Sequence, residues 1–182
     1  MEYSGIRNFL SEDSILLHLS YLKQLRASLS LMKKYYPELE GKTAFDLASG
    51  SHRLRVPGEI ASVAVNCLLH DAYFSSFTDT PRPSRPIKKY YSSENAFCYE
   101  ILSRAERAEC GFVYALRDKR GEVRIISDEF CKIPLTSETV LAIDISEHAY
   151  FSDYGFRREE YLRRALSYLN LAKLFPEDGK TS

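Results

Sequence analysis

Apolar residues recur at helical spacing in two stretches of the first eighty residues. The first stretch begins after Ser11, which is a suitable N-cap residue. Glu12 and Asp13 follow Ser11 in the first turn, where negative side chains interact favourably with the helix dipole. Pro37 closes this stretch, and the second pattern covers residues 58–77. Together they predict an antiparallel helical hairpin. The apolar positions of the first stretch are Ile15, Leu16, Leu19, Leu22, Leu25, Leu29 and Met32.

A proline-rich break follows the predicted hairpin. Pro81, Pro83 and Pro86 lie within six residues, and such a density of proline prevents a helix. We therefore predict a helical hairpin lobe over residues 1–80, a linker over 81–91 and a second lobe over 92–182.

The second lobe mixes helical and strand patterns. Its strand patterns are short runs of alternating apolar and polar residues, or of apolar residues alone, bounded by turn residues. The dipeptide Arg120-Gly121 is predicted to form the turn between the first two strands. The predicted class is α+β: an N-terminal antiparallel helical hairpin followed by an α/β lobe with a small three-stranded antiparallel sheet. The predicted helices are 92–107 and 159–174, and the predicted strands are 111–116, 123–126 and 139–144.

Composition excludes several classes of function. The 182 residues carry 25 basic and 25 acidic side chains, so no net charge favours nucleic acid or an anionic membrane as a partner. No apolar run reaches the roughly 18 residues of a membrane helix. The N-terminus lacks a basic segment followed by an apolar one, so we expect a cytoplasmic protein. The four cysteines, which form no CxxC pair, are then expected to be reduced thiols.

Asp144 and His148 form the first candidate for chemistry. Asp144 ends a predicted strand and His148 follows four residues later, a pair that suits iron, manganese or zinc but is commonly an ordinary hydrogen-bonded pair. His18 and His70 lie on the apolar faces of the two predicted helices, where each alone fits a core histidine. Taken together, the four residues predict a His₃Asp metal site across both lobes. A bound ion would keep positive charge there, which favours an anionic substrate or hydroxide. The fourth histidine, His52, is predicted to be a surface residue.

The run DISEHAYFSDY that starts at Asp144, with Arg158, Tyr161 and Leu162 after it, resembles the signature D-x-W-E-H-A-Y-x-x-D-Y…R-x-x-Y-L of the iron/manganese superoxide dismutases. Three further stretches resemble the family in the same order, namely residues 10–18, 66–74 and 111–116. The resemblance implies this family's fold, superoxide as substrate, a homodimer and one Fe or Mn ion per subunit. The implied ligands are His18, His70, Asp144 and His148.

Around these four positions the chain departs from the family pattern. Leu22 and Phe151 replace a histidine and a tyrosine that bond across the family's dimer interface, so we expect an apolar contact there. Arg26 stands where the family has a tyrosine, eight residues after the first ligand. The other departures are Leu69 for asparagine and Ser146, Phe112 and Tyr114 for tryptophans.

Three residues have candidate roles by this resemblance. Asn66 stands where some iron-type members carry a glutamine that bonds the metal-bound solvent, although its shorter side chain equally suits a local backbone bond. Arg26 either lines the entrance and attracts anions or, as we slightly favour, is a surface arginine paired with a carboxylate. Glu147 either reaches the partner's ligand histidine across a twofold interface or is simply exposed.

These observations leave three functions open. The first is superoxide dismutation at a cycling metal. The second is a catalytically impaired relative that serves in binding or assembly, and the third is a structural or sensory ion of zinc or iron. Because the four ligands are intact while their surroundings are altered, metal binding is a firmer prediction than efficient catalysis. The choice between iron and manganese and between dimer and tetramer stays open.

Overall fold

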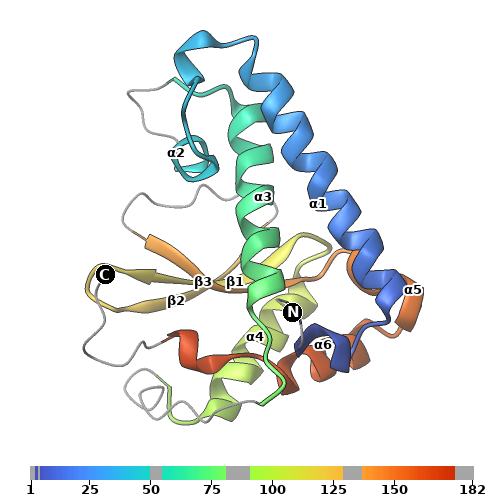
Figure 1. Ribbon diagram of the computed structural model, residues 1–182. Helices are drawn as coiled ribbons and strands as arrows, with labels where there is room; N and C mark the ends of the chain where they lie inside the picture. Colours follow the sequence, from blue (N-terminus) through green and yellow to red (C-terminus); the bar gives the residue numbers. More distant parts are fainter. Residues whose placement is uncertain (1–2, 4, 50–54, 81–90, 129–136, 175–182) are drawn as a thin grey trace.

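The computed structural model describes residues 3, 5–49, 55–80, 91–128 and 137–174 of the chain. Two long helices, α1 (Glu12–Lys33) and α3 (Gly58–Ser75), run antiparallel to each other, and the lower half of α3 crosses a small sheet while the upper part of the hairpin extends beyond it (Figure 1). They form the predicted hairpin, and the structure as a whole has the predicted α+β class.

The start of α1 is fixed by hydrogen bonds from both sides of the helix. The predicted cap forms, because the backbone N–H of Ser14 donates to Ser11 Oγ at 3.2 Å. The N–H of Ser11 itself donates to Asp153 Oδ2 at 2.8 Å. This second bond ties the first turn of α1 to the C-terminal part of the chain, where one of the candidate ligands lies.

A short helix that the apolar pattern did not predict, α2 (Ala44–Ala48), packs against α3 in the connection between the two long helices. Thr43 and Asp46 form a reciprocal capping box at its start. Leu47 and Ala48 are fully buried, so this turn closes the apolar upper end of the hairpin. Two 3₁₀ turns, Gly5–Asn8 and Pro37–Leu39, flank α1.

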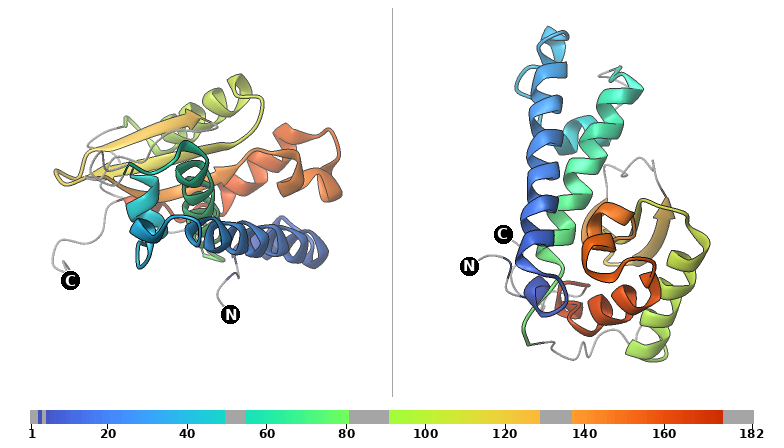
Figure 2. Two further views of the ribbon diagram at one scale, coloured as in Figure 1. Left: turned by 90° about the horizontal axis from the view of Figure 1, so that it is seen from above. Right: turned by 90° about the vertical axis from the view of Figure 1, so that its right-hand side faces the viewer.

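The sheet contains three antiparallel strands, as predicted, and their order is β2-β1-β3. They are β1 (Phe112–Asp118), β2 (Val123–Asp128) and β3 (Ser137–Asp144). Helix α3 packs on β3, whereas α4 (Glu94–Arg107) packs on β1 and β2 from the opposite face, an arrangement visible in the view from above (Figure 2). Phe112 pairs with Asp144, so the last residue of β3 is held by the ladder.

The C-terminal part differs from the single helix predicted over residues 159–174. It contains α5 (Glu147–Tyr154), α6 (Arg158–Ser167) and a 3₁₀ turn (Leu171–Leu174). The prediction was wrong after Ser167 because the chain there pairs with the residues that follow α3. The N–H of Thr78 donates to Tyr168 O at 2.9 Å, and the N–H of Asn170 donates to Ser76 O at 2.8 Å.

Other predictions are answered only in part. The linker predicted over 81–91 lies outside the described residues except for Tyr91, so the division into two lobes stays a prediction. Cys67 and Cys98 are free thiols, whereas Cys131 lies outside the described residues. Among the described helices, none combines the length and the apolar character that a membrane span requires.

Candidate metal centre

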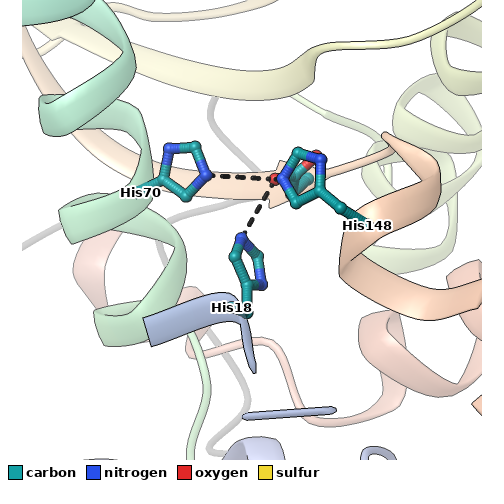
Figure 3. Close-up of side chains that lie close together, drawn as sticks. His18, His70 and His148 are labelled. Atoms are coloured by element: carbon teal, nitrogen blue, oxygen red, sulfur yellow. Dashed lines mark ion pairs between the residues drawn. The ribbon is translucent and has the colours of Figure 1, made fainter. Parts of the chain in front are cut away.

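Four residues from four separate elements meet at the lower end of the helical hairpin. His18 lies in α1, His70 in α3, Asp144 at the end of β3 and His148 at the start of α5. One candidate ligand atom from each lies within 4.8 Å of all the others. Figure 3 shows the three imidazole rings converging from different directions. The structure therefore brings together all four residues that the sequence nominated.

The cluster is centred on one carboxylate oxygen. Asp144 Oδ2 lies 3.0 Å from His148 Nε2, 3.2 Å from His18 Nε2 and 3.5 Å from His70 Nε2. The side chains of His18, His70 and Asp144 are at most 1% exposed, whereas that of His148 is 35% exposed. Solvent therefore reaches this group from the side of His148.

Neighbouring groups fix the orientation of the ligands. Nδ1–H of His70 donates to the backbone oxygen of Asn66 at 2.7 Å, which leaves the Nε2 lone pair directed at the cluster. Asp144 Oδ1 accepts the N–H of Ser146 at 2.8 Å, so Oδ2 is the oxygen presented to the histidines. The backbone oxygen of Asp144 accepts the hydroxyl of Tyr161 at 2.8 Å.

The donor atoms have the properties expected of metal ligands. His18 Nε2, His70 Nε2 and Asp144 Oδ2 are buried without a hydrogen-bond partner. An unsatisfied buried polar atom costs about 1–3 kcal/mol, and three such atoms facing one point are accounted for if they share a cation. Three imidazole nitrogens and one carboxylate oxygen suit iron, manganese or zinc. The residues present therefore fit a mononuclear metal ion.

Electrostatics favour the protonation states that a metal needs. Burial alone would raise the pKa of Asp144, but its interactions with His148 and His18 outweigh burial and hold that pKa well below its usual range. Burial lowers the pKa of His70 to about 4, although Asp144 opposes this. At neutral pH these groups are thus an ionised carboxylate and a neutral imidazole, the forms that bind metal. In contrast, Asp144 raises the pKa of His148 despite the partial burial of that ring.

Among the residues that the structure describes, none of the three with candidate supporting roles forms a hydrogen bond or ion pair between its side chain and the four clustered side chains. The side-chain amide of Asn66 donates to Ser62 O at 3.2 Å, which matches the local-bond alternative. Arg26 forms an ion pair with Asp71, with both side chains about half exposed, and this matches the surface-arginine alternative. Glu147 is exposed at the first position of α5.

Three of the positions that depart from the family pattern, Phe112, Ser146 and Leu22, have defined surroundings in the structure. Phe112 packs against His70 with ring centroids 4.9 Å apart, and Ser146 Oγ accepts the N–H of Gly111 at 3.0 Å, so both support the site. Leu22 is 4% exposed and Phe151 is 43% exposed within the single chain. The expected apolar contact between these two residues across an interface stays a prediction. His52 lies outside the described residues.

One residue of the site was not predicted. The ring of Tyr21 lies 4.6 Å from that of His148 and 5.4 Å from that of His70, between centroids. Burial and the charge of Asp144 raise the pKa of its hydroxyl, which is therefore neutral at physiological pH. The available signal was its position three residues after His18, on the same side of the helix.

Comparisons with known proteins agree with this geometry. Residues 80–175 match the family model of the iron/manganese superoxide dismutases, C-terminal domain. The chain is 26% identical over 173 residues to a superoxide dismutase [Fe] of Bacteroides fragilis, which covers 88% of this chain and 86% of that protein. It is also 26% identical over 126 residues to a superoxide dismutase [Fe] of Legionella pneumophila, covering 64% of this chain and 66% of that protein, just under two thirds.

The matched region contains two of the four clustered residues, Asp144 and His148, and the alignment to the Bacteroides protein extends over most of the chain. The family match covers more than half of the 182 residues. Fold, clustered donor atoms and sequence similarity therefore lead to the same conclusion: the chain belongs to the iron/manganese superoxide dismutase family.

Proposed function

We propose that the protein binds one iron or manganese ion through His18, His70, Asp144 and His148 and dismutes superoxide to oxygen and hydrogen peroxide. The observation that carries this proposal is the convergence of four donor atoms within 4.8 Å of one another, three of which are buried without a hydrogen-bond partner. When bound, the ion would supply reversible one-electron chemistry, by which two superoxide anions and two protons become one O₂ and one H₂O₂.

The residues of the chain contribute position and charge. Asp144 brings one negative charge to three imidazoles that are neutral as ligands, so a divalent or trivalent ion keeps net positive charge. This charge attracts a small anion, which approaches from the side of His148 because the other three side chains are buried. The backbone oxygen of Asn66 and the N–H of Ser146 hold His70 and Asp144 in place without changing the charge.

The experiment measures metal and activity together. Protein purified without chelator is analysed for iron, manganese and zinc, and dismutation is assayed after reconstitution with iron or manganese. Bound iron or manganese with turnover supports the proposal. Absence of any bound metal after reconstitution would refute the metal centre itself.

His148→Ala gives the matched test of a single ligand. We expect it to abolish stoichiometric metal binding while the far-UV circular dichroism stays that of a folded helical protein, because His148 is partly exposed and lies at the start of a helix. His52→Ala is the control, since His52 is the remaining histidine of the sequence and is not assigned to the site. Unchanged metal stoichiometry in His148→Ala would rule out its role as a ligand.

A metal-binding protein without efficient dismutation is a second candidate. The observation that favours it is the amide of Asn66, which bonds to Ser62 within its own helix and not toward the cluster. Zinc in the purified protein, or bound iron without turnover, would support this alternative over the enzyme.

We further propose that two copies form a homodimer through the surface around α5. Glu147 is exposed beside His148, and Phe151 and Phe156 pack edge to face while remaining 43% and 91% exposed. Large exposed aromatic side chains next to each other are typical of an interface. Sedimentation of the wild type and of Phe156→Ser at equal concentration tests this proposal, and a wild-type monomer would contradict it.

A further inference from the structure

The four-residue cluster has one exposed side, and Tyr21 lies over it. Three of the four side chains are at most 1% exposed, and solvent meets the cluster through His148. The ring of Tyr21 contacts this exposed imidazole and also that of His70, with interplanar angles of 45° and 53°. Tyr21 is itself 39% exposed, so it stands between the bulk solvent and two of the candidate ligands.

The geometry points to Tyr21 as a shielding residue that limits access of solvent and chelators to the metal centre and slows the exchange of the bound ion. This inference rests on the metal-binding part of the proposed function and on no property of the catalytic reaction. A metal that leaves a His₃Asp site does so by stepwise replacement of its ligands, and the ligand nearest solvent is the first to be replaced. That ligand is His148, which Tyr21 covers.

The ring of Tyr21 accounts for this role better than its hydroxyl. The hydroxyl makes no hydrogen bond with any described residue, whereas the ring packs against two imidazoles. A tyrosine ring is large and has only two side-chain torsions, so it covers area at a low entropic cost. The apolar surroundings of a metal site control its access to solvent.

Other residues near this opening are committed elsewhere. Arg26, five residues after Tyr21 on α1, forms an ion pair with Asp71 on α3. Leu22, which follows Tyr21 in the sequence, is buried in the core. Tyr21, in contrast, is partly exposed, and its ring contacts two candidate ligands.

The test follows loss of Co(II) from protein loaded with one equivalent, using the visible absorption of the bound ion after addition of excess EDTA. Four proteins are compared: wild type, Tyr21→Ala, Tyr21→Phe and Tyr35→Ala. Tyr35 follows the end of α1 and is 76% exposed, so its truncation controls for removing a surface tyrosine. We expect loss of Co(II) to be about tenfold faster or more in Tyr21→Ala. Tyr21→Phe and Tyr35→Ala should stay within about twofold of the wild type, since both keep the ring of residue 21.

The outcomes separate this inference from the proposed function. If wild-type protein binds no Co(II), both the metal centre and its shielding are refuted. If it binds Co(II) and Tyr21→Ala loses it at the wild-type rate, only the shielding role is refuted. Loss from Tyr21→Phe as fast as from Tyr21→Ala would also overturn it, because the ring alone would then not protect the ion. Should Tyr21→Ala fail to fold, Tyr21→Leu takes its place, and an unchanged rate in that variant counts equally against the inference.

Discussion

Tyr161 connects the metal centre to the core, and replacing it with phenylalanine should weaken both. Its side chain is fully buried, and its hydroxyl donates to the backbone oxygen of Asp144 at 2.8 Å. The hydroxyl of Tyr73, also fully buried, lies 3.2 Å from it. Because Tyr161 donates its proton to Asp144, Tyr73 donates to Tyr161. Tyr161→Phe therefore removes one donor and one acceptor from a dry environment.

The magnitude follows from these two bonds. Each ordinary hydrogen bond contributes about 0.5–1.5 kcal/mol, and a buried group left without a partner costs about 1–3 kcal/mol. The Tyr73 hydroxyl loses its described partner, so we expect Tyr161→Phe to lower the free energy of unfolding by about 2–3 kcal/mol. Metal affinity should fall by about tenfold, because the peptide that carries the Asp144 ligand loses a support.

Urea unfolding of the metal-free protein, followed by circular dichroism, measures the first effect. A competition titration with a coloured chelator measures the second. Tyr150→Phe is the control: its ring stacks on Tyr161 at 5.0 Å between centroids, and its hydroxyl forms no hydrogen bond with a described residue. We expect its change to be below about 0.5 kcal/mol. A loss in Tyr161→Phe no larger than in Tyr150→Phe would refute the reasoning.

Two further predictions concern Arg26 in α1 and Gly5 in the 3₁₀ turn that precedes it. Arg26→Ala should cost less than about 1 kcal/mol and leave metal stoichiometry unchanged, because its ion pair with Asp71 is about half exposed. Urea unfolding and metal analysis check this, and loss of the metal would restore a direct role for Arg26. Gly5→Ala should destabilise by about 2–3 kcal/mol or more, because a Cβ there would lie 2.2 Å from the backbone nitrogen of Thr78. Gly58→Ala, where a Cβ meets nothing within 4 Å, should unfold at the wild-type temperature or slightly above it.

Periodic patterns in the sequence determined the main elements. The spacing of apolar residues predicted α1 and α3, and the antiparallel sheet followed from three short strand patterns separated by turn signals. These predictions held because burial of one face of a helix or strand depends mainly on the local order of residues. The same order placed Asp144 at a strand end, where the pairing with Phe112 now holds it.

Contacts between distant segments decided what the sequence alone did not. The helical pattern continues past Ser167, but hydrogen bonds to the residues after α3 compete with further helical turns and end α6. The ring of Tyr21 likewise meets His70 of α3 and His148 of α5, which only the packing of those helices against α1 brings within its reach. Amphipathic spacing predicts that a residue faces the interior. Which side chains it contacts there depends on how the four elements pack together. For this reason the four histidine and aspartate positions were predictable from sequence, while the tyrosine that covers them was found only in the tertiary structure.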